Sequence, residues 1–373
     1  MKNTMLQAPE NDGILGRQIA FFAAFVLPVY KLLELPSILA RFTGGDLLLP
    51  AFLQYLFQTG VLIALLFVAS RSDKPLLERL EEKLGKWTVV IYGAYCLYFL
   101  LAAVLPLLDL EKFVYATFYD TSPTAFAFIF FFLFSAFVCV RGIKALGRFA
   151  DLSLFLFVLP FFALIAMSIA EADASNLLPI FEYRFGHTMS AFTYSTPHFS
   201  DTILLLPMIG NLRYKKNDAK KIACGYGLGG VFTLLFLGVF YGLYSTVAAR
   251  EHYAFSKIAQ YFPALTVIGR VDLLFVYILC VVLFVFVATP MHYTVDFCSR
   301  IFGTKRRVLF SLILNVGAFF FVLFCNKYYN AIYSFFGQSL FPVFWIMADF
   351  LPLLLLLLCI ENKRKLKKEI SHA

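Results

Sequence analysis

Apolar stretches long enough to cross a membrane recur along the whole 373-residue chain, and they decide its fold class. A bilayer core about 30 Å thick requires about 20 apolar residues for each helical crossing. Only 15% of the residues are charged, whereas about a quarter are charged in soluble domains. The sequence therefore predicts an all-α membrane protein and excludes a water-soluble globule.

Ten transmembrane helices are expected, which together make residues 1–373 a single transmembrane domain. The spans lie at about 14–41, 46–70, 87–109, 123–141, 148–170, 189–211, 222–248, 270–297, 306–325 and 339–360. Between the second and third spans, residues 72–86 predict an amphipathic surface helix, because Leu76, Leu80 and Leu84 share one face and Pro75 suits a first helical turn. Residues 361–373 form a basic tail.

The lysine and arginine residues divide unequally between the two sides of these spans. Of the 32 in the chain, 22 fall in the tail and in the loops after even-numbered spans, and seven fall on the opposite side. Positive charge marks cytoplasmic loops, so both chain ends and residues 72–86 are expected in the cytoplasm. The net charge of +9 is then an orientation signal and at most a contact for membrane lipid headgroups, so no nucleic-acid partner is expected.

Spans 1 and 6 carry proline and ionisable residues at mid-length. Span 1 contains Pro28, Lys31, Glu34 and Pro36, and span 6 contains Pro197, His198, Asp201 and Pro207. In each span the ionisable pair is spaced i, i+3, and each span begins one five-span half of the chain. Breaks at matching positions of two inverted halves indicate a midplane binding site in secondary transporters, because freed backbone groups and half-helix ends bind polar solutes there.

We expect these breaks near residues 28–31 and 196–200. Two alternatives remain open for them. Proline is common in membrane helices, so a kink by itself has no functional meaning. Lys31 and Glu34 also have the spacing of a structural ion pair.

Several short stretches together resemble one known family. They are Leu35-Pro36-Ser37-Ile38-Leu39-Ala40 with the turn Gly44-Gly45-Asp46, then Leu178-Pro179, Gly186, Phe199 and Leu204-Leu205-Leu206-Pro207, then Gly269-Arg270-Val271-Asp272-Leu273-Leu274-Phe275, and the amphipathic helix before span 3. In these stretches the chain resembles the spore-germination permease family, the B subunits of germinant receptors, within the amino acid-polyamine-organocation superfamily.

The resemblance implies a five-plus-five inverted repeat of the LeuT type, with repeats at about 14–170 and 189–360. It implies that broken helices 1 and 6 hold a small-molecule ligand, most suitably an amino acid, between walls from spans 3 and 8. A-type and C-type germinant receptor subunits are the implied partners. The candidate ligand-binding residues are Pro28, Val29, Tyr30, Lys31, Glu34, Tyr95, Tyr98, Thr196, His198, Phe199, Ser200, Asp201, Thr289 and Tyr293. Buried tyrosine and threonine hydroxyls are also common as hydrogen-bonded packing groups, which is the alternative interpretation of Tyr95, Tyr98, Thr289 and Tyr293.

Two functions remain open, a germinant sensor in the spore inner membrane and an amino acid permease in the bacterial plasma membrane, because both use a two-state fold. Proton-coupled members of the superfamily often place a lysine on span 5. Residues 149–170 contain none, which weakens the case for proton coupling by that route. An enzyme is not expected, since the chain has no H-E-x-x-H, G-x-S-x-G or phosphate-binding glycine motif, although His198 and Asp201 have acid–base chemistry. The seven scattered cysteines predict no metal or cofactor.

Overall fold

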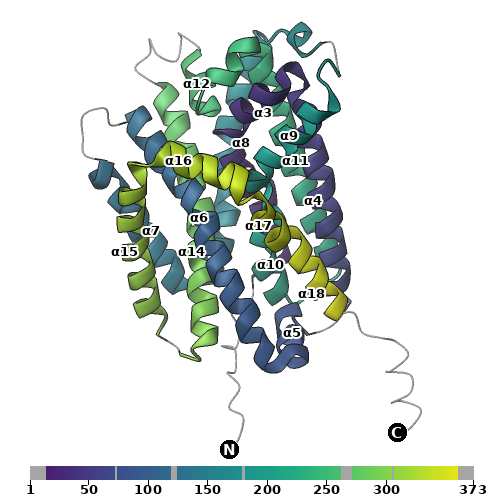
Figure 1. The fold of residues 1–373 in the computed structure, drawn as a ribbon, viewed down its shortest axis with the longest axis vertical. Coiled ribbons are helices and arrows are strands. Elements are labelled where there is room, and N and C mark those ends of the chain that lie inside the picture. Colours follow the sequence, from purple (N-terminus) through teal and green to yellow (C-terminus); the bar gives the residue numbers. More distant parts are fainter. Residues whose placement is uncertain are drawn as a thin grey trace, which may run out of the picture.

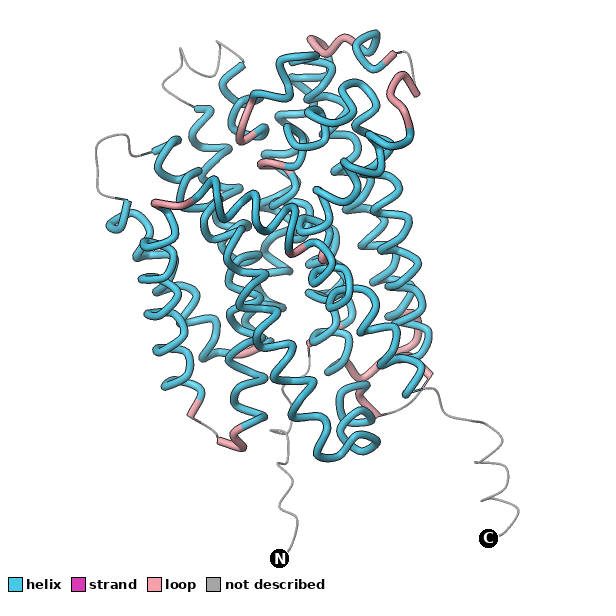
Figure 2. Tube along the Cα trace, viewed as in Figure 1, coloured by secondary structure: helices cyan, strands magenta, loops and turns pink. Residues whose placement is uncertain are grey.

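The computed structural model describes residues 14–71, 74–118, 124–178, 181–261, 271–304 and 306–359. Every regular element in these ranges is a helix, and the long helices run side by side along the longest axis of the molecule (Figure 1, Figure 2). The predicted tail at 361–373 lies outside the described residues, as do Ser72, Pro179, Gly269 and Arg270.

The helices follow one another in the order that the apolar pattern predicts. They are α1 (Gly16–Phe21), α2 (Leu27–Lys31), α3 (Leu35–Thr43), α4 (Leu48–Ala69), α5 (Leu76–Leu84), α6 (Thr88–Phe118), α7 (Thr124–Arg141), α8 (Ile143–Ile169), α9 (Phe185–Ser195), α10 (Asp201–Asn211), α11 (Asp218–Tyr244), α12 (Ala254–Tyr261), α14 (Val271–Ile301), α15 (Arg307–Asn326), α16 (Tyr329–Ser334), α17 (Phe341–Trp345) and α18 (Leu351–Cys359).

Six helical segments of the described chain are long and apolar enough to cross a membrane. They are Leu35–Ala69, Leu76–Phe113, Ile143–Ile169, Asp218–Arg250, Leu273–Ile301 and Arg307–Asn326. Two shorter apolar helices, Phe128–Arg141 and Phe341–Leu357, lie where spans 4 and 10 are predicted. Spans 1 and 6 are each divided into pieces too short to qualify alone. The described helices therefore agree with the ten predicted spans.

The break in span 1 lies one turn later than predicted. A π-helical turn, Phe22–Val26, leads into α2, and Pro28 occupies the first turn of α2. Proline has no amide to donate, and it is tolerated in a first helical turn, where the wider turn before it accommodates the change in register. The chain therefore stays helical through Lys31, and the regular helix is interrupted by a turn at residues 32–34. The expected position at residues 28–31 is wrong, although the span is broken.

The break in span 6 lies where it is predicted. α9 ends at Ser195, a 3-10 turn covers Thr196–Phe199, and α10 begins at Asp201. Pro197 lies in the first turn of the 3-10 segment, where no amide donor is required. Ser200 has a ψ angle of 40°, outside the helical range, so α9 and α10 are separate half-helices.

Two glycines let α11 pack directly against the backbone of span 1. A Cβ atom on Gly225 would lie 2.4 Å from the carbonyl oxygen of Ala20, and one on Gly229 would lie 2.6 Å from that of Ala23. Small residues four apart permit this kind of close approach between membrane helices. The contact places Tyr226, next to Gly225, in the buried interior.

The two ends of the helix bundle carry different short helices. α5 lies at one end and α12 at the other, and these ends are called the α5 end and the α12 end below (Figure 1). α5 buries Leu76, Leu77 and Leu80 and leaves Glu78 exposed. The amphipathic helix predicted before span 3 is therefore confirmed.

Candidate ligand site between the broken helices

A buried ion pair joins the two broken spans. Nζ of Lys31, at the end of α2, lies 2.6 Å from Oδ1 of Asp201, at the start of α10, and both side chains are almost fully buried. The two residues are 170 positions apart in the sequence. The pairs suggested by the i, i+3 spacing, Lys31 with Glu34 and His198 with Asp201, are wrong. That spacing brings side chains together only on a continuous helix, and each helix is interrupted between the two residues.

Neighbouring groups hold the ion pair in place. The Tyr226 hydroxyl donates a hydrogen bond to Oδ2 of Asp201 at 2.8 Å. Nζ of Lys31 lies 3.5 Å from the carbonyl oxygen of Leu27 and 5.2 Å from the ring centre of Phe199. Aromatic faces attract cations, and a buried ion pair persists only where its other polar atoms are also satisfied. The sequence did not identify Tyr226, which reaches the site only because α11 packs so closely on span 1.

The freed carbonyl groups of the span 1 break are occupied by α12. The amide of Ala254 donates to the Leu33 carbonyl at 3.0 Å, and the amide of Phe255 donates to the Leu32 carbonyl at 3.1 Å. The carbonyls of residues 28–30, which were expected to be free, accept the amides of Leu32 and Leu33 within the helix turn. The carbonyls of Pro28, Val29 and Tyr30 are therefore already hydrogen-bonded within the protein.

The acidic residue of this break is also partnered by the segment before α12. Oε2 of the buried Glu34 lies 2.9 Å from Nδ1 of His252, two residues before α12, and the His252 side chain is 57% exposed. The hydrogen bond to Glu34 raises the pKa of His252 above its usual value. Glu34 therefore helps to fix the segment before α12 against span 1.

The span 6 break is different, because buried polar atoms there have no hydrogen-bond partner within the described chain. These atoms are both ring nitrogens of His198, Oγ of Ser200 and the hydroxyl of Tyr98. Tyr98 and Ser200 lie near each other without meeting hydrogen-bond geometry. His198 stacks on Tyr30 with ring centres 5.0 Å apart. More than nine tenths of buried polar groups in native proteins have a partner, so this cluster indicates a place for water or ligand.

Tyr30 stacks on His198 and also bonds to a buried carboxylate on α6. Its hydroxyl donates to Oδ2 of the buried Asp109 on α6 at 2.8 Å, and the Tyr329 hydroxyl donates to Oδ1 of the same carboxylate at 2.8 Å. Lys31 and Tyr30 are adjacent in sequence but contact different partners, one the ion pair and the other this carboxylate. The end of α2 therefore faces both the site and the α12 end.

Three candidate hydroxyls are already used within the protein. Thr289 donates to the Val285 carbonyl of its own helix at 2.7 Å. Tyr293 donates to the Leu204 carbonyl at 2.8 Å and so ties α14 to α10. Thr196 donates to a carbonyl of α9 at 3.0 Å. The packing interpretation describes these three residues, whereas Tyr98 keeps an unpartnered hydroxyl.

A second buried polar network lies beside the site and was absent from the candidates. Nε2 of Gln58, on α4, donates to Oδ1 of Asp349 at 2.7 Å, and Oε1 of Gln58 accepts the Thr202 hydroxyl at 2.6 Å. Asp349 is the single charged residue from Phe341 to Cys359, whereas Gln58 shares the otherwise apolar α4 with Gln54 and Thr59. An ionisable residue within a membrane span is a functional candidate by default, so the signal for Asp349 was present in the sequence.

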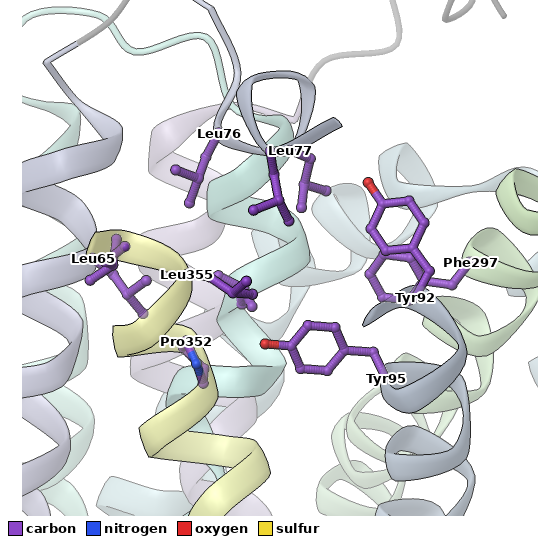
Figure 3. Close-up of a pocket in the computed structure, with 11 residues that line it drawn as sticks. Leu65, Leu76, Leu77, Tyr92, Tyr95, Phe297, Pro352 and Leu355 are labelled. Carbon is purple, nitrogen blue, oxygen red and sulfur yellow. The ribbon is translucent and has the colours of Figure 1, made fainter. Parts of the chain in front are cut away.

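A small cavity of about 20 Å³ lies toward the α5 end. Its lining is Leu65, Leu76, Leu77, Leu80, Tyr92, Tyr95, Leu206, Phe297, Pro352, Leu355 and Leu356. Tyr95 projects from α6 across the cavity toward α18, and its hydroxyl has no partner among the described residues (Figure 3). A space of this size holds about one water molecule. The structure thus places Tyr95 in an apolar cavity apart from the span 6 break.

No group of three or more histidine, cysteine, aspartate or glutamate side chains in the described ranges is placed to hold a metal ion. Cys96 and Cys298 bring their sulfur atoms within 3.7 Å, and both are free thiols. The site itself presents an ion pair and unpartnered hydrogen-bonding groups.

Comparison with known proteins agrees with this architecture. A sequence model described as spore germination protein, of the spore permease family, matches residues 51–330. A search of curated proteins by sequence finds no match. Among solved structures, the crystal structure of MhsT in complex with L-phenylalanine is similar at a TM-score of 0.60 and 14% identity, covering 90% of this chain and 87% of that chain. At this identity the likeness concerns the fold alone, and it confirms the predicted LeuT-type transporter fold. The chain therefore belongs to the spore germination permease family and is an integral membrane protein.

Proposed function

We propose that this protein is the B-type subunit of a spore germinant receptor, which binds an amino acid between the two broken helices and signals germination to A-type and C-type subunits. The observation that carries the binding step is the cluster of unpartnered buried polar atoms on His198, Ser200 and Tyr98. These atoms lie at the break of span 6, next to the ion pair of Lys31 and Asp201.

The chemistry of the cluster suits an amino acid. A neutral histidine offers one donor and one acceptor, and each hydroxyl can donate or accept. An α-amino acid presents three ammonium donors and two carboxylate acceptors, which complement such a mixed set. The structural neighbour MhsT was solved with L-phenylalanine, which supports an amino acid as the class of ligand.

The distribution of basic residues supports placing the α5 end in the cytoplasm and the α12 end outside it. Arg300 of α14 contacts Glu81 of α5, Asn211 at the end of α10 and Asp296, each at 3.1 Å. These contacts join α14 to α5 and α10 at the α5 end, and α12 bonds to the span 1 break at the other. Contacts at both ends are suited to hold a ligand between them and to report it by a shift between states.

A set of hydroxyl and imidazole variants tests the binding step. We expect Tyr98→Phe, Ser200→Ala and His198→Phe each to raise the half-maximal amino acid concentration for germination by about five- to 150-fold, because a lost hydrogen bond to a buried partner costs about 1–3 kcal/mol. The measurement is a dose–response curve for each of the twenty common amino acids, in spores with matched membrane abundance of the variant.

Tyr95→Phe is the matched control, since it also removes an unpartnered buried hydroxyl but in the separate cavity. It should leave the dose–response curve unchanged. Wild-type curves for all three site variants would show that the pocket is assigned wrongly. Robust amino acid uptake by the purified chain in proteoliposomes, without partner subunits, would replace the sensor with a permease.

A further inference from the structure

We infer that the ion pair between Lys31 and Asp201 is the charge-recognition element of the site, and that it selects zwitterions over solutes with a single charge. This inference rests on the proposed function, because it concerns the ligand of the same site. It starts from the geometry of the pair, which is buried, short and placed between the two breaks.

Lys31 retains donor capacity for a ligand carboxylate. Its ammonium group has three donors. One is used at 2.6 Å on Asp201, and the only other hydrogen-bond contact within the described residues is the Leu27 carbonyl at the long distance of 3.5 Å. The remaining neighbours are the aromatic faces of Phe199 and Tyr55, at 5.2 and 5.7 Å. A carboxylate would bind the ammonium more strongly than an aromatic face does.

Asp201 retains acceptor capacity for a ligand ammonium. A carboxylate accepts about four hydrogen bonds in total. Oδ1 accepts from Lys31 and Oδ2 accepts from Tyr226, so both oxygens of the carboxylate are held in place. Tyr226 is itself fixed by the close packing of α11 at Gly225. Asp201 therefore stays in position while a second cation binds beside Lys31.

The balance of charge explains the expected preference. The pair is neutral as a unit, and a zwitterion adds an ammonium for Asp201 and a carboxylate for Lys31 without changing the net charge. An amine or a carboxylate alone adds one buried charge without a full partner, which is unfavourable away from water. Asp109 and Asp349 lie near the site with neutral donors on them and would favour an amine, so the amine is the critical competitor.

Matched sets of probes test the preference on the intact wild-type protein. The zwitterions are L-alanine, L-valine and L-phenylalanine. Their amines are ethylamine, isobutylamine and 2-phenylethylamine, and their acids are propionate, isovalerate and 3-phenylpropionate. We expect the best-binding zwitterion to exceed its own amine and acid in affinity by at least about tenfold, measured by isothermal titration or thermal stabilisation of the purified full-length chain. An amine or acid that binds as tightly as its zwitterion would overturn the inference.

Reciprocal variants identify the residues that carry the preference. Lys31→Met should turn the preference toward the amine, and Asp201→Asn should turn it toward the acid. Where either single variant fails to fold, Lys31→Met with Asp201→Asn keeps the site neutral and should reduce the discrimination among the three probes to less than about threefold. An unchanged order of probes, or loss of all binding by folded single variants, would overturn the inference.

This outcome is distinct from failure of the proposed function. Zwitterion binding that depends on Tyr98 and Ser200 but ignores Lys31 and Asp201 would retain the amino acid site and remove only the role of the ion pair. If no probe binds and no amino acid triggers germination, both proposals are wrong.

Discussion

The two broken helices differ in what covers their breaks. In span 1, the carbonyls of Leu32 and Leu33 accept amides from α12, so the backbone freed by the break is already bonded. In span 6, His198 and Ser200 keep buried polar atoms that no described residue satisfies. α12 supplies partners to the backbone of the first break, whereas no described residue supplies partners to these side-chain atoms of the second. A break provides a binding site only where its polar groups are left without a partner.

The largest expected effect comes from removing the ion pair between Lys31 and Asp201, which joins the two breaks. Lys31→Met leaves Asp201 buried without its counter-charge and should destabilise the protein by about 3–5 kcal/mol. The double variant Lys31→Met with Asp201→Asn should recover most of that loss, because no unpaired charge remains. Equilibrium unfolding in mixed micelles measures both, and equal losses would mean that shape rather than charge joins the breaks.

An intermediate effect on stability should come from pH, and it should act at the span 1 break, where His252 bonds to Glu34. The hydrogen bond to Glu34 raises the pKa of His252, so the charged imidazole stabilises the folded protein below about pH 6.5. That stabilisation is lost as the pH rises through the raised pKa. Because the His252 side chain is 57% exposed, the change should stay below about 1 kcal/mol.

His252→Gln provides the control for this pH effect. Thermal unfolding of wild type and variant at pH 6 and pH 8.5 should show the wild type losing its advantage at the higher pH. An advantage that is the same at both values would mean that the charge of His252 does not contribute to closure.

The smallest effect on stability should come from the open break. Tyr98→Phe and Ser200→Ala remove hydroxyls that make no hydrogen bond within the described chain, so each should change the free energy of unfolding by less than about 0.5 kcal/mol in the absence of ligand. Tyr293→Phe, which loses the bond to Leu204, should cost about 1 kcal/mol under the same conditions. Equal losses in all three variants would mean that the hydroxyls at the open break are structural.

Local sequence patterns were sufficient for the fold and for the existence of both breaks. Apolar length determined the spans, and proline beside ionisable residues marked spans 1 and 6. The position of the first break was missed because Pro28 falls in a first helical turn, where it is compatible with a helix. Its neighbouring π-helical turn has no clear sequence signal.

The contacts between side chains of different helices could not be predicted from the sequence, for a different reason. Lys31 and Asp201 meet across 170 residues, and Tyr226 reaches them through a backbone contact that only the packing of two helices creates. Spacing along one helix predicted Lys31 with Glu34, because a single sequence shows only local neighbours. Asp349 was detectable as a lone charged residue within an apolar span, although nothing local pairs it with Gln58.

The α12 contact with Leu32 and Leu33 also affects how fast the closed end can open. Water that enters as α12 leaves can bond to the same two carbonyls, so their hydrogen bonds are exchanged and not lost. The same exchange is impossible in lipid, where a freed carbonyl has no substitute partner. Departure of α12 would therefore be coupled to hydration of these two carbonyls, and a dry, open intermediate is disfavoured.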